Sequence, residues 1–251
     1  MKKVIINADD FGINKVVTEE IERLIEKGAI SSTTVMANGS CLEQARNFAN
    51  LHPKVSYGVH LCLSEFGSIT KSKSLQRAGL IDENGVFLHK AIFHSRNLKE
   101  KYVIEAIRNE LNAQIEVLKS LGFNISHADS HHHVHTIYPL REVFAEVLQN
   151  SGIKRLRLGA NFQTLRDKAH IMKWQKRTLL NRYYRKFFIT TDKFCSFSDF
   201  SNGVCPIHDG ETFELMCHPG HPGSKYQDEV RRMEQTVLPS GIKLISYNEL
   251  H

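Results

Sequence analysis

Short apolar segments alternate with amphipathic segments along most of this 251-residue chain, and that alternation constrains the fold more than any other feature. The apolar segments have the length and residue types of buried strands, and the amphipathic ones repeat apolar residues at helical spacing. Strands are predicted at residues 3–8, 33–37, 55–61, 124–129, 154–158, 213–217 and 243–246. Helices are predicted at residues 14–27, 40–49, 100–121, 139–148 and 228–238.

Repeated strand–helix units indicate parallel strands joined by right-handed crossovers. About seven units in a chain of this length favour an α/β fold with a closed or nearly closed barrel over a flat doubly wound sheet. Neither a repeat nor a linker divides the sequence, so residues 1–251 are expected to form a single domain. Residues 64–98 interrupt the alternation, and so long a connection predicts a lid over a functional site.

The composition excludes several classes of protein. No run of eighteen apolar residues is present, and the first strand turns acidic at Asp9 before a signal-peptide core could form. We therefore expect a soluble, cytoplasmic protein. The five cysteines include no Cys-x-x-Cys pair, which argues against a disulfide framework or a thiolate zinc site.

Polar residues stand where four of the predicted strands end. Asp9 and Asp10 follow the first strand, His60 ends the third, and His218 follows the strand at 213–217. The fourth group is the histidine cluster at residues 127–135, which holds five of the 14 histidines. Parallel strands open their carboxyl ends on one face, where active sites are built, so these groups are expected to converge.

Each group has a structural and a chemical interpretation. A carboxylate after the first strand could cap the next helix, but only one of two adjacent acids can reach the helix amides. In a metal site both would act, one binding the cation and the other taking a proton from water. His60 taken alone favours a hydrogen-bonded core residue over a metal ligand. His218 is either incidental to a Pro-Gly turn or a general acid.

The histidine cluster favours the metal interpretation. In an extended chain, alternate positions share one face, and all five of those positions from 127 to 135 are His or Asp. Aspartate and histidine without thiolate suit Zn²⁺, Mn²⁺, Co²⁺ or Mg²⁺, and the sequence does not choose among them.

Residues 154–186 hold eleven Lys and Arg against one acid, Asp167, with aromatic residues interleaved at helical spacing. Two interpretations stay open for the part at 166–188. It is either a basic helix with its apolar face in the core, or a surface that docks on an anionic membrane. No nucleic-acid-binding pattern accompanies it, so no nucleic-acid partner is expected.

At these residues the chain resembles the YdjC-like carbohydrate deacetylase family. The matching motifs include Asp-Asp-Phe-Gly at 9–12, Gly-Val-His-Leu at 58–61, the cluster at 127–135 and Cys-His-Pro-Gly at 217–220. The resemblance implies a distorted α/β barrel related to the polysaccharide deacetylases, and a homodimer. It also implies one divalent metal ion, Mg²⁺ or Zn²⁺. By the same resemblance the metal ligands are Asp10, His60 and His131.

The resemblance assigns further roles. Asp9 would be the catalytic base and His218 the general acid, while His133, His135 and Arg157 are expected around the metal or in contact with substrate. Two segments depart from the family pattern, because 63–68 lacks Gly-x-Pro and 158–161 lacks Pro-Glu. Both departures leave the identity of the sugar open.

The predicted function is metal-dependent removal of the acetyl group from an N-acetylated amino sugar, in an N-acetylglucosamine-containing oligosaccharide or glycolipid. The alternatives are a phosphoester hydrolase, which normally needs a second metal about 3.5–4 Å from the first, and a non-catalytic protein that binds metal or sugar.

Overall fold

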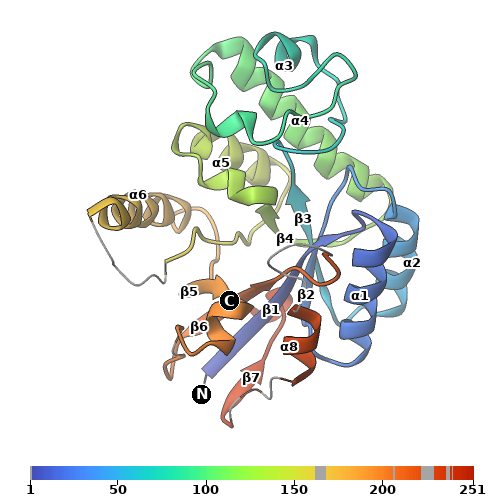
Figure 1. Ribbon diagram of the computed structural model, residues 1–251, viewed down its shortest axis with the longest axis vertical. Helices are drawn as coiled ribbons and strands as arrows, with labels where there is room; N and C mark the ends of the chain where they lie inside the picture. Colours follow the sequence, from blue (N-terminus) through green and yellow to red (C-terminus); the bar gives the residue numbers. More distant parts are fainter. Residues whose placement is uncertain (1, 162–167, 206, 222–228, 236–237, 239) are drawn as a thin grey trace.

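The computed structural model describes all residues except 1, 162–167, 206, 222–228, 236–237 and 239. Its centre is a seven-stranded parallel sheet with the order β4-β3-β2-β1-β6-β5, and β7 pairs with β1 beside this path (Figure 1). The strands are β1 (Lys2–Phe11), β2 (Ser32–Val35), β3 (Ser56–Leu61), β4 (Ile125–Ser130), β5 (Lys193–Ser196), β6 (Thr212–Cys217) and β7 (Ile242–Leu244).

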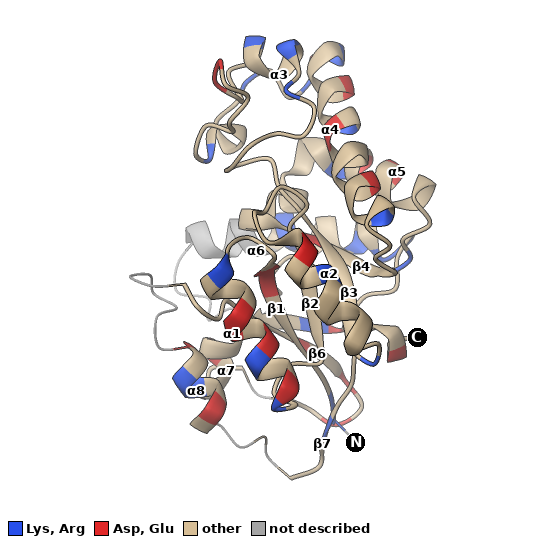
Figure 2. Ribbon diagram, turned by 90° about the vertical axis from the view of Figure 1, so that its right-hand side faces the viewer, with Lys and Arg blue, Asp and Glu red and all other residues tan. Residues whose placement is uncertain are grey.

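Helices connect these strands and carry most of the charge, whereas the central strands carry little (Figure 2). Asn14 begins the first helix as predicted, since its side chain accepts from the Val17 N–H at 3.0 Å. The helices are α1 (Lys15–Glu26), α2 (Leu42–Leu51), α3 (Lys73–Arg77), α4 (Lys101–Ser120), α5 (Arg141–Asn150), α6 (Lys168–Tyr184), α7 (Phe197–Ser201) and α8 (Glu229–Gln235). The 3-10 turns are η1 (Ala91–Phe93), η2 (His131–Thr136), η3 (Tyr138–Leu140) and η4 (Tyr247–Glu249).

The barrel is nearly closed. Within the described residues no continuous ladder joins β4 to β5, but two isolated parallel bridges lie between them, Ala128 to Leu156 and Arg155 to Ile189. The predicted strand at 154–158 is therefore wrong as a regular strand. Its backbone makes only two hydrogen bonds to β4, through Ala128, before the chain leaves the sheet. The α/β class and the distorted, nearly closed barrel are confirmed.

The segment at 64–98 is folded and anchored. It packs on α4 beyond the carboxyl ends of β3 and β4 (Figure 1), and it buries apolar residues of its own such as Leu75 and Phe87. At its base the buried carboxylate of Glu110 accepts from the backbone N–H groups of Ile69 and Thr70, both at 2.9 Å. A buried carboxylate satisfied in this way fixes the start of the segment. Its role as a lid stays a prediction.

The basic stretch at 166–188 divides between core and solvent. Residues 166–167 lie outside the described residues, as do the side chains of 168–174. Leu180, Tyr184 and Phe188 are buried, whereas Leu179 and Phe187 are 57% and 42% exposed. One apolar stripe thus packs in the core as the first interpretation expects, and a second one meets solvent.

No helix in the described part of the chain is long and apolar enough to cross a membrane. The five cysteines are free thiols, as expected for a chain without a disulfide framework.

Candidate active site

A cavity of about 1080 Å³ opens at the carboxyl ends of β1, β3, β4 and β6. The four polar groups predicted to converge all reach it, as Asp9, Asp10, His60, His131 and His218 line its wall. The segment at 64–98 supplies another part of the wall, and its lining residues are Glu65, Phe66, Gly67, Val86, Lys90 and Phe93.

A β-bulge allows two consecutive aspartates to face this cavity. Neighbouring residues of a regular strand point to opposite faces. In β1 the pairing with β2 shifts between Ala8 and Phe11, and Asp10 lies in the left-handed region with φ 69°. An inserted residue of this kind re-aims the side chains around it, and aspartate tolerates the left-handed conformation better than most residues. Both Asp9 and Asp10 therefore serve one site.

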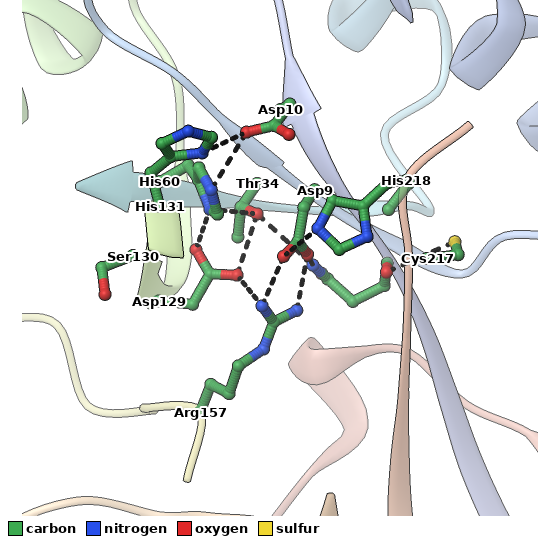
Figure 3. A network of polar contacts seen from close by, with 12 residues as sticks. Asp9, Asp10, Thr34, His60, Asp129, Ser130, His131, Arg157, Cys217 and His218 are labelled. Carbon is green, nitrogen blue, oxygen red and sulfur yellow. Dashed lines mark hydrogen bonds and ion pairs between the residues drawn. The ribbon is translucent and has the colours of Figure 1, made fainter. Parts of the chain in front are cut away.

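The three predicted metal ligands lie together (Figure 3). Asp10 Oδ1 is 3.1 Å from His60 Nε2 and 3.0 Å from His131 Nδ1. Burial alone would raise the pKa of Asp10, but the charge of His60 and the hydrogen bond from His131 hold it well below its usual value. One ionised carboxylate and two imidazoles thus converge on a single position.

The surroundings of His60 fit a divalent metal. Its Nδ1 lies 2.6 Å from Asp129 Oδ1, and Thr34 Oγ1 donates to the other oxygen of Asp129 at 3.1 Å. A carboxylate that holds one nitrogen of a histidine turns the other toward the ion, an arrangement typical of metal-bound histidine. The donor set of one Asp and two His suits Zn²⁺ or Mg²⁺ among other divalent ions.

Asp9 is held by Arg157. The two Nη atoms of Arg157 each donate to one oxygen of Asp9 at 2.7 Å. Arg157 is fully buried and also contacts Asp129 and Glu214, each at 2.7 Å. Burial would raise the pKa of Asp9, but the charge of Arg157 lowers it well below its usual value, so Asp9 stays ionised.

His218 lies next to Asp9 (Figure 3). Its Nε2 is 3.6 Å from Asp9 Oδ2, and its backbone N–H donates to Glu229. Burial lowers the pKa of His218 to about 4, and burial raises that of Glu229 to about 7. His221, three residues further along the chain, has its Nε2 3.1 Å from Asp10 Oδ2.

The histidine cluster does not alternate as expected. The chain is extended only to Ser130, and then His132 and His133 adopt left-handed φ values of 52° and 57° within η2. The shared face predicted for positions 127 to 135 is therefore wrong beyond the strand, because two left-handed residues turn the backbone. His131 reaches Asp10, whereas His132 Nδ1 contacts Ser64 Oγ at 2.9 Å.

The three residues expected near metal or substrate have separate places. His133 lines the cavity. His135 is fully buried and does not line the cavity, and its Nδ1 forms a hydrogen bond of 2.5 Å with Ser130 Oγ. Arg157 lies beneath Asp9, and its guanidinium donates hydrogen bonds to the carboxylates of Asp9 and Glu214. Of the three, only His133 is among the cavity-lining residues.

Sequence reasoning gave no role to Glu65, Thr34 or Glu214. Glu65 Oε2 lies 3.0 Å from His131 Nε2. The sequence did contain a signal for Glu65, because this carboxylate comes five residues after His60, within the segment at 63–68 that departs from the family pattern. Glu214 and Thr34 lie inside buried strands, where polar residues need a partner, but that partner is remote in sequence.

A family model described as "YdjC-like protein" matches residues 3–242. A carbohydrate deacetylase of Clostridium beijerinckii is 31% identical, over 89% of this chain and 83% of that protein. One from Geobacillus stearothermophilus is also 31% identical, over 98% of this chain and 97% of that protein. A solved structure from Enterococcus faecalis has a TM-score of 0.72 at 28% identity, covering 99% of this chain and 98% of that one.

Proposed function

Because the chain belongs to the YdjC-like protein family, we propose that it is a carbohydrate deacetylase, an amide hydrolase that removes the acetyl group from an N-acetylated amino sugar. The observation that carries this function is the meeting of two units in one cavity. Asp10, His60 and His131 form a metal-ligand set, and Asp9 and His218 form an adjacent proton-transfer pair.

A divalent ion held by Asp10, His60 and His131 would act as a Lewis acid, polarising the acetamide carbonyl and lowering the pKa of water. Its identity is proposed as Mg²⁺ or Zn²⁺, the hard and borderline ions that such a donor set accepts. The protein prepares this position by fixing His60 through Asp129.

Asp9 accepts the proton of the attacking water. Its carboxylate plane is fixed by Arg157, and Asn7 Nδ2 donates to Oδ1 at 3.0 Å, which leaves Oδ2 as the more open oxygen. The same Oδ2 faces His218. The low pKa of Asp9 makes it a weak base, so the proton passes on readily.

His218 delivers that proton to the sugar nitrogen as the C–N bond breaks. Its pKa of about 4 means that His218 is neutral at pH 7, so it needs a proton from within the site. The pKa of Asp9 lies lower still, so transfer from Asp9 to His218 is favourable. The gap of 3.6 Å between them needs only a small side-chain shift. Water thereby supplies both the hydroxyl of acetate and the proton on the amine.

The wall formed by the segment at 64–98 contacts the sugar. Phe66, Val86 and Phe93 are 37%, 40% and 40% exposed and line the cavity. A pyranose ring has an apolar face that packs on such side chains and hydroxyl groups that reach polar ones. His133 is proposed as a further contact. Homodimerisation stays a prediction from the family resemblance, and a cytoplasmic location stays a prediction from the sequence composition.

An acetate-release screen tests this function. Substrates are N-acetylglucosamine, its β-1,4-linked oligomers and an N-acetylglucosaminyl lipid, each with Mg²⁺, Zn²⁺, Mn²⁺ or Co²⁺. We expect equal amounts of acetate and free amine from at least one substrate. Phosphate release from phosphorylated sugars without acetate release would favour the phosphoester hydrolase. Tight sugar binding without turnover would favour the non-catalytic protein.

A further inference from the structure

The two histidine ligands of the proposed metal site are held in the same way. His60 faces Asp10 with Nε2 and a second carboxylate, Asp129, with Nδ1. His131 faces Asp10 with Nδ1 and a second carboxylate, Glu65, with Nε2 at 3.0 Å. Each ring is thus fixed at both nitrogens by an acidic residue from another part of the chain.

Glu65 differs from Asp129 in its origin. Asp129 lies on β4, whereas Glu65 lies on the segment at 64–98. The backbone on both sides of Glu65 is fixed. The Cys62 N–H donates to Gln114 Oε1 at 2.8 Å, and the Phe87 N–H donates to the Phe66 carbonyl at 2.8 Å. Phe66 also has a φ of 63°, a conformation that a bulky residue rarely adopts without support from its surroundings.

The contact between Glu65 and His131 has a clear chemical purpose. A neutral imidazole that binds an ion through Nδ1 keeps its proton on Nε2, and that partly buried N–H needs an acceptor. Glu65 Oε2 is at hydrogen-bond distance from this nitrogen, and Oε1 contacts His89 Nδ1 farther along the same segment. Both oxygens of Glu65 therefore have partners.

A second metal ion is the competing explanation, because Glu65, His131 and His132 also form a group of close donor atoms. Such an ion would require His131 to bridge two metals. A hydrogen bond from His131 to Glu65 explains the geometry without a histidine that bridges two ions.

We propose that Glu65 is a positioning residue that accepts the Nε2–H of His131 and thereby directs Nδ1 toward the metal. This inference rests on the metal site of the proposed function. It makes the segment at 64–98 part of the metal centre as well as part of the cavity wall.

The test measures metal affinity in Glu65→Ala and Glu65→Gln. Outer carboxylates of this kind typically change metal affinity by about 10–100-fold. We expect Zn²⁺ to bind about 10–100-fold more weakly to Glu65→Ala by competition titration. The Gln side chain keeps a neutral hydrogen-bond acceptor, so Glu65→Gln should lose less Zn²⁺ affinity than Glu65→Ala. Co²⁺-loaded Glu65→Ala should also show a changed visible spectrum, which a distant structural effect would not produce.

Two control variants accompany the test. Glu83→Gln removes an exposed carboxylate of the same segment and should leave affinity unchanged. His89→Ala removes the contact to the other oxygen of Glu65 and should weaken Zn²⁺ binding less than threefold. Glu65 is 29% exposed, His89 is 62% exposed and Glu83 is also exposed, so we expect all four variants to keep the wild-type melting temperature.

The outcomes separate this inference from the function on which it rests. Equal Zn²⁺ affinity in wild-type and Glu65→Ala protein would overturn the inference alone. Two ions per wild-type chain, falling to one in Glu65→Ala, would make Glu65 a ligand and also overturn it. A wild-type chain that binds none of the divalent ions would overturn the metal-dependent function and this inference together.

Discussion

Arg157 holds both carboxylate oxygens of Asp9, with 2.7 Å between each nitrogen and oxygen. Both residues are buried, so this pair is screened little by solvent. These two parallel hydrogen bonds fix the plane of the Asp9 carboxylate, and the positive charge of Arg157 keeps Asp9 ionised at neutral pH. Arg157 thus prepares the proposed base from below, without lining the cavity.

Substitutions at Arg157 separate this role from substrate binding. Arg157→Met would leave Asp9, Asp129 and Glu214 buried without their cation. Removing one partner of a buried ion pair costs about 3–5 kcal/mol, so we expect a loss of this size in urea unfolding. Arg157→Lys keeps the positive charge but cannot form the two parallel hydrogen bonds to Asp9. It should lower kcat far more than it raises KM, whereas a raised KM with unchanged kcat would show the substrate contact first expected.

Truncating the apolar wall should weaken substrate binding. Phe93 is 40% exposed and lines the cavity, so Phe93→Ala removes part of the surface proposed to pack on the sugar. Losing about 1 kcal/mol of apolar contact corresponds to about a fivefold rise in KM. Leu88→Ala is the matched control, because Leu88 is 43% exposed on the same segment and is not among the lining residues. Equal KM values for the two variants would contradict contact between this wall and substrate.

Stability should depend on pH through Glu229. Burial raises the pKa of Glu229 from 4.5 to about 7, so the folded chain holds this proton more tightly than the unfolded chain. The resulting stabilisation is complete below pH about 4.5 and is lost as pH rises through about 7, by at most about 3 kcal/mol. The free energy of unfolding of wild-type protein should therefore fall relative to Glu229→Gln between pH 5 and pH 8. A difference that stays constant or rises over this range would refute the shift.

The second apolar stripe of the basic stretch predicts binding to anionic vesicles. Leu179 and Phe187 are exposed, and Lys176, Arg182 and Lys186 beside them are exposed too. Each basic residue near an anionic membrane contributes about 1 kcal/mol. We expect co-sedimentation with anionic but not neutral vesicles, weakened by salt and by Lys176→Glu with Lys186→Glu. Failure to bind at low salt would show that this face has no membrane role.

Much of the site could be predicted because its signals are local. Asp9, Asp10, His60 and His218 each end an apolar segment, and parallel strands bring such ends together. The fold class follows from the same alternation.

Three features could not be predicted in this way. The backbone of the histidine cluster turns at His132 because two residues adopt left-handed φ values. An alternating pattern of residues along the sequence does not reveal such a turn. The partners of Arg157 lie on three different strands, and only the packed barrel places its guanidinium beneath Asp9. The anchoring of residues 64–98 by Glu110 is non-local for the same reason.

Acetate release during metal titration tests the central claim most directly. Chelator-treated protein is titrated with Zn²⁺ or Mg²⁺ on the best N-acetylated sugar, with Asp9→Asn, Asp10→Asn and His60→Ala in parallel. We predict that wild-type activity rises to a plateau at one ion per chain. Asp9→Asn should bind the ion but turn over about 10²–10⁴-fold more slowly, and His60→Ala should lose tight binding. Full activity without metal, or loss of metal in Asp9→Asn but not in Asp10→Asn, would contradict the account.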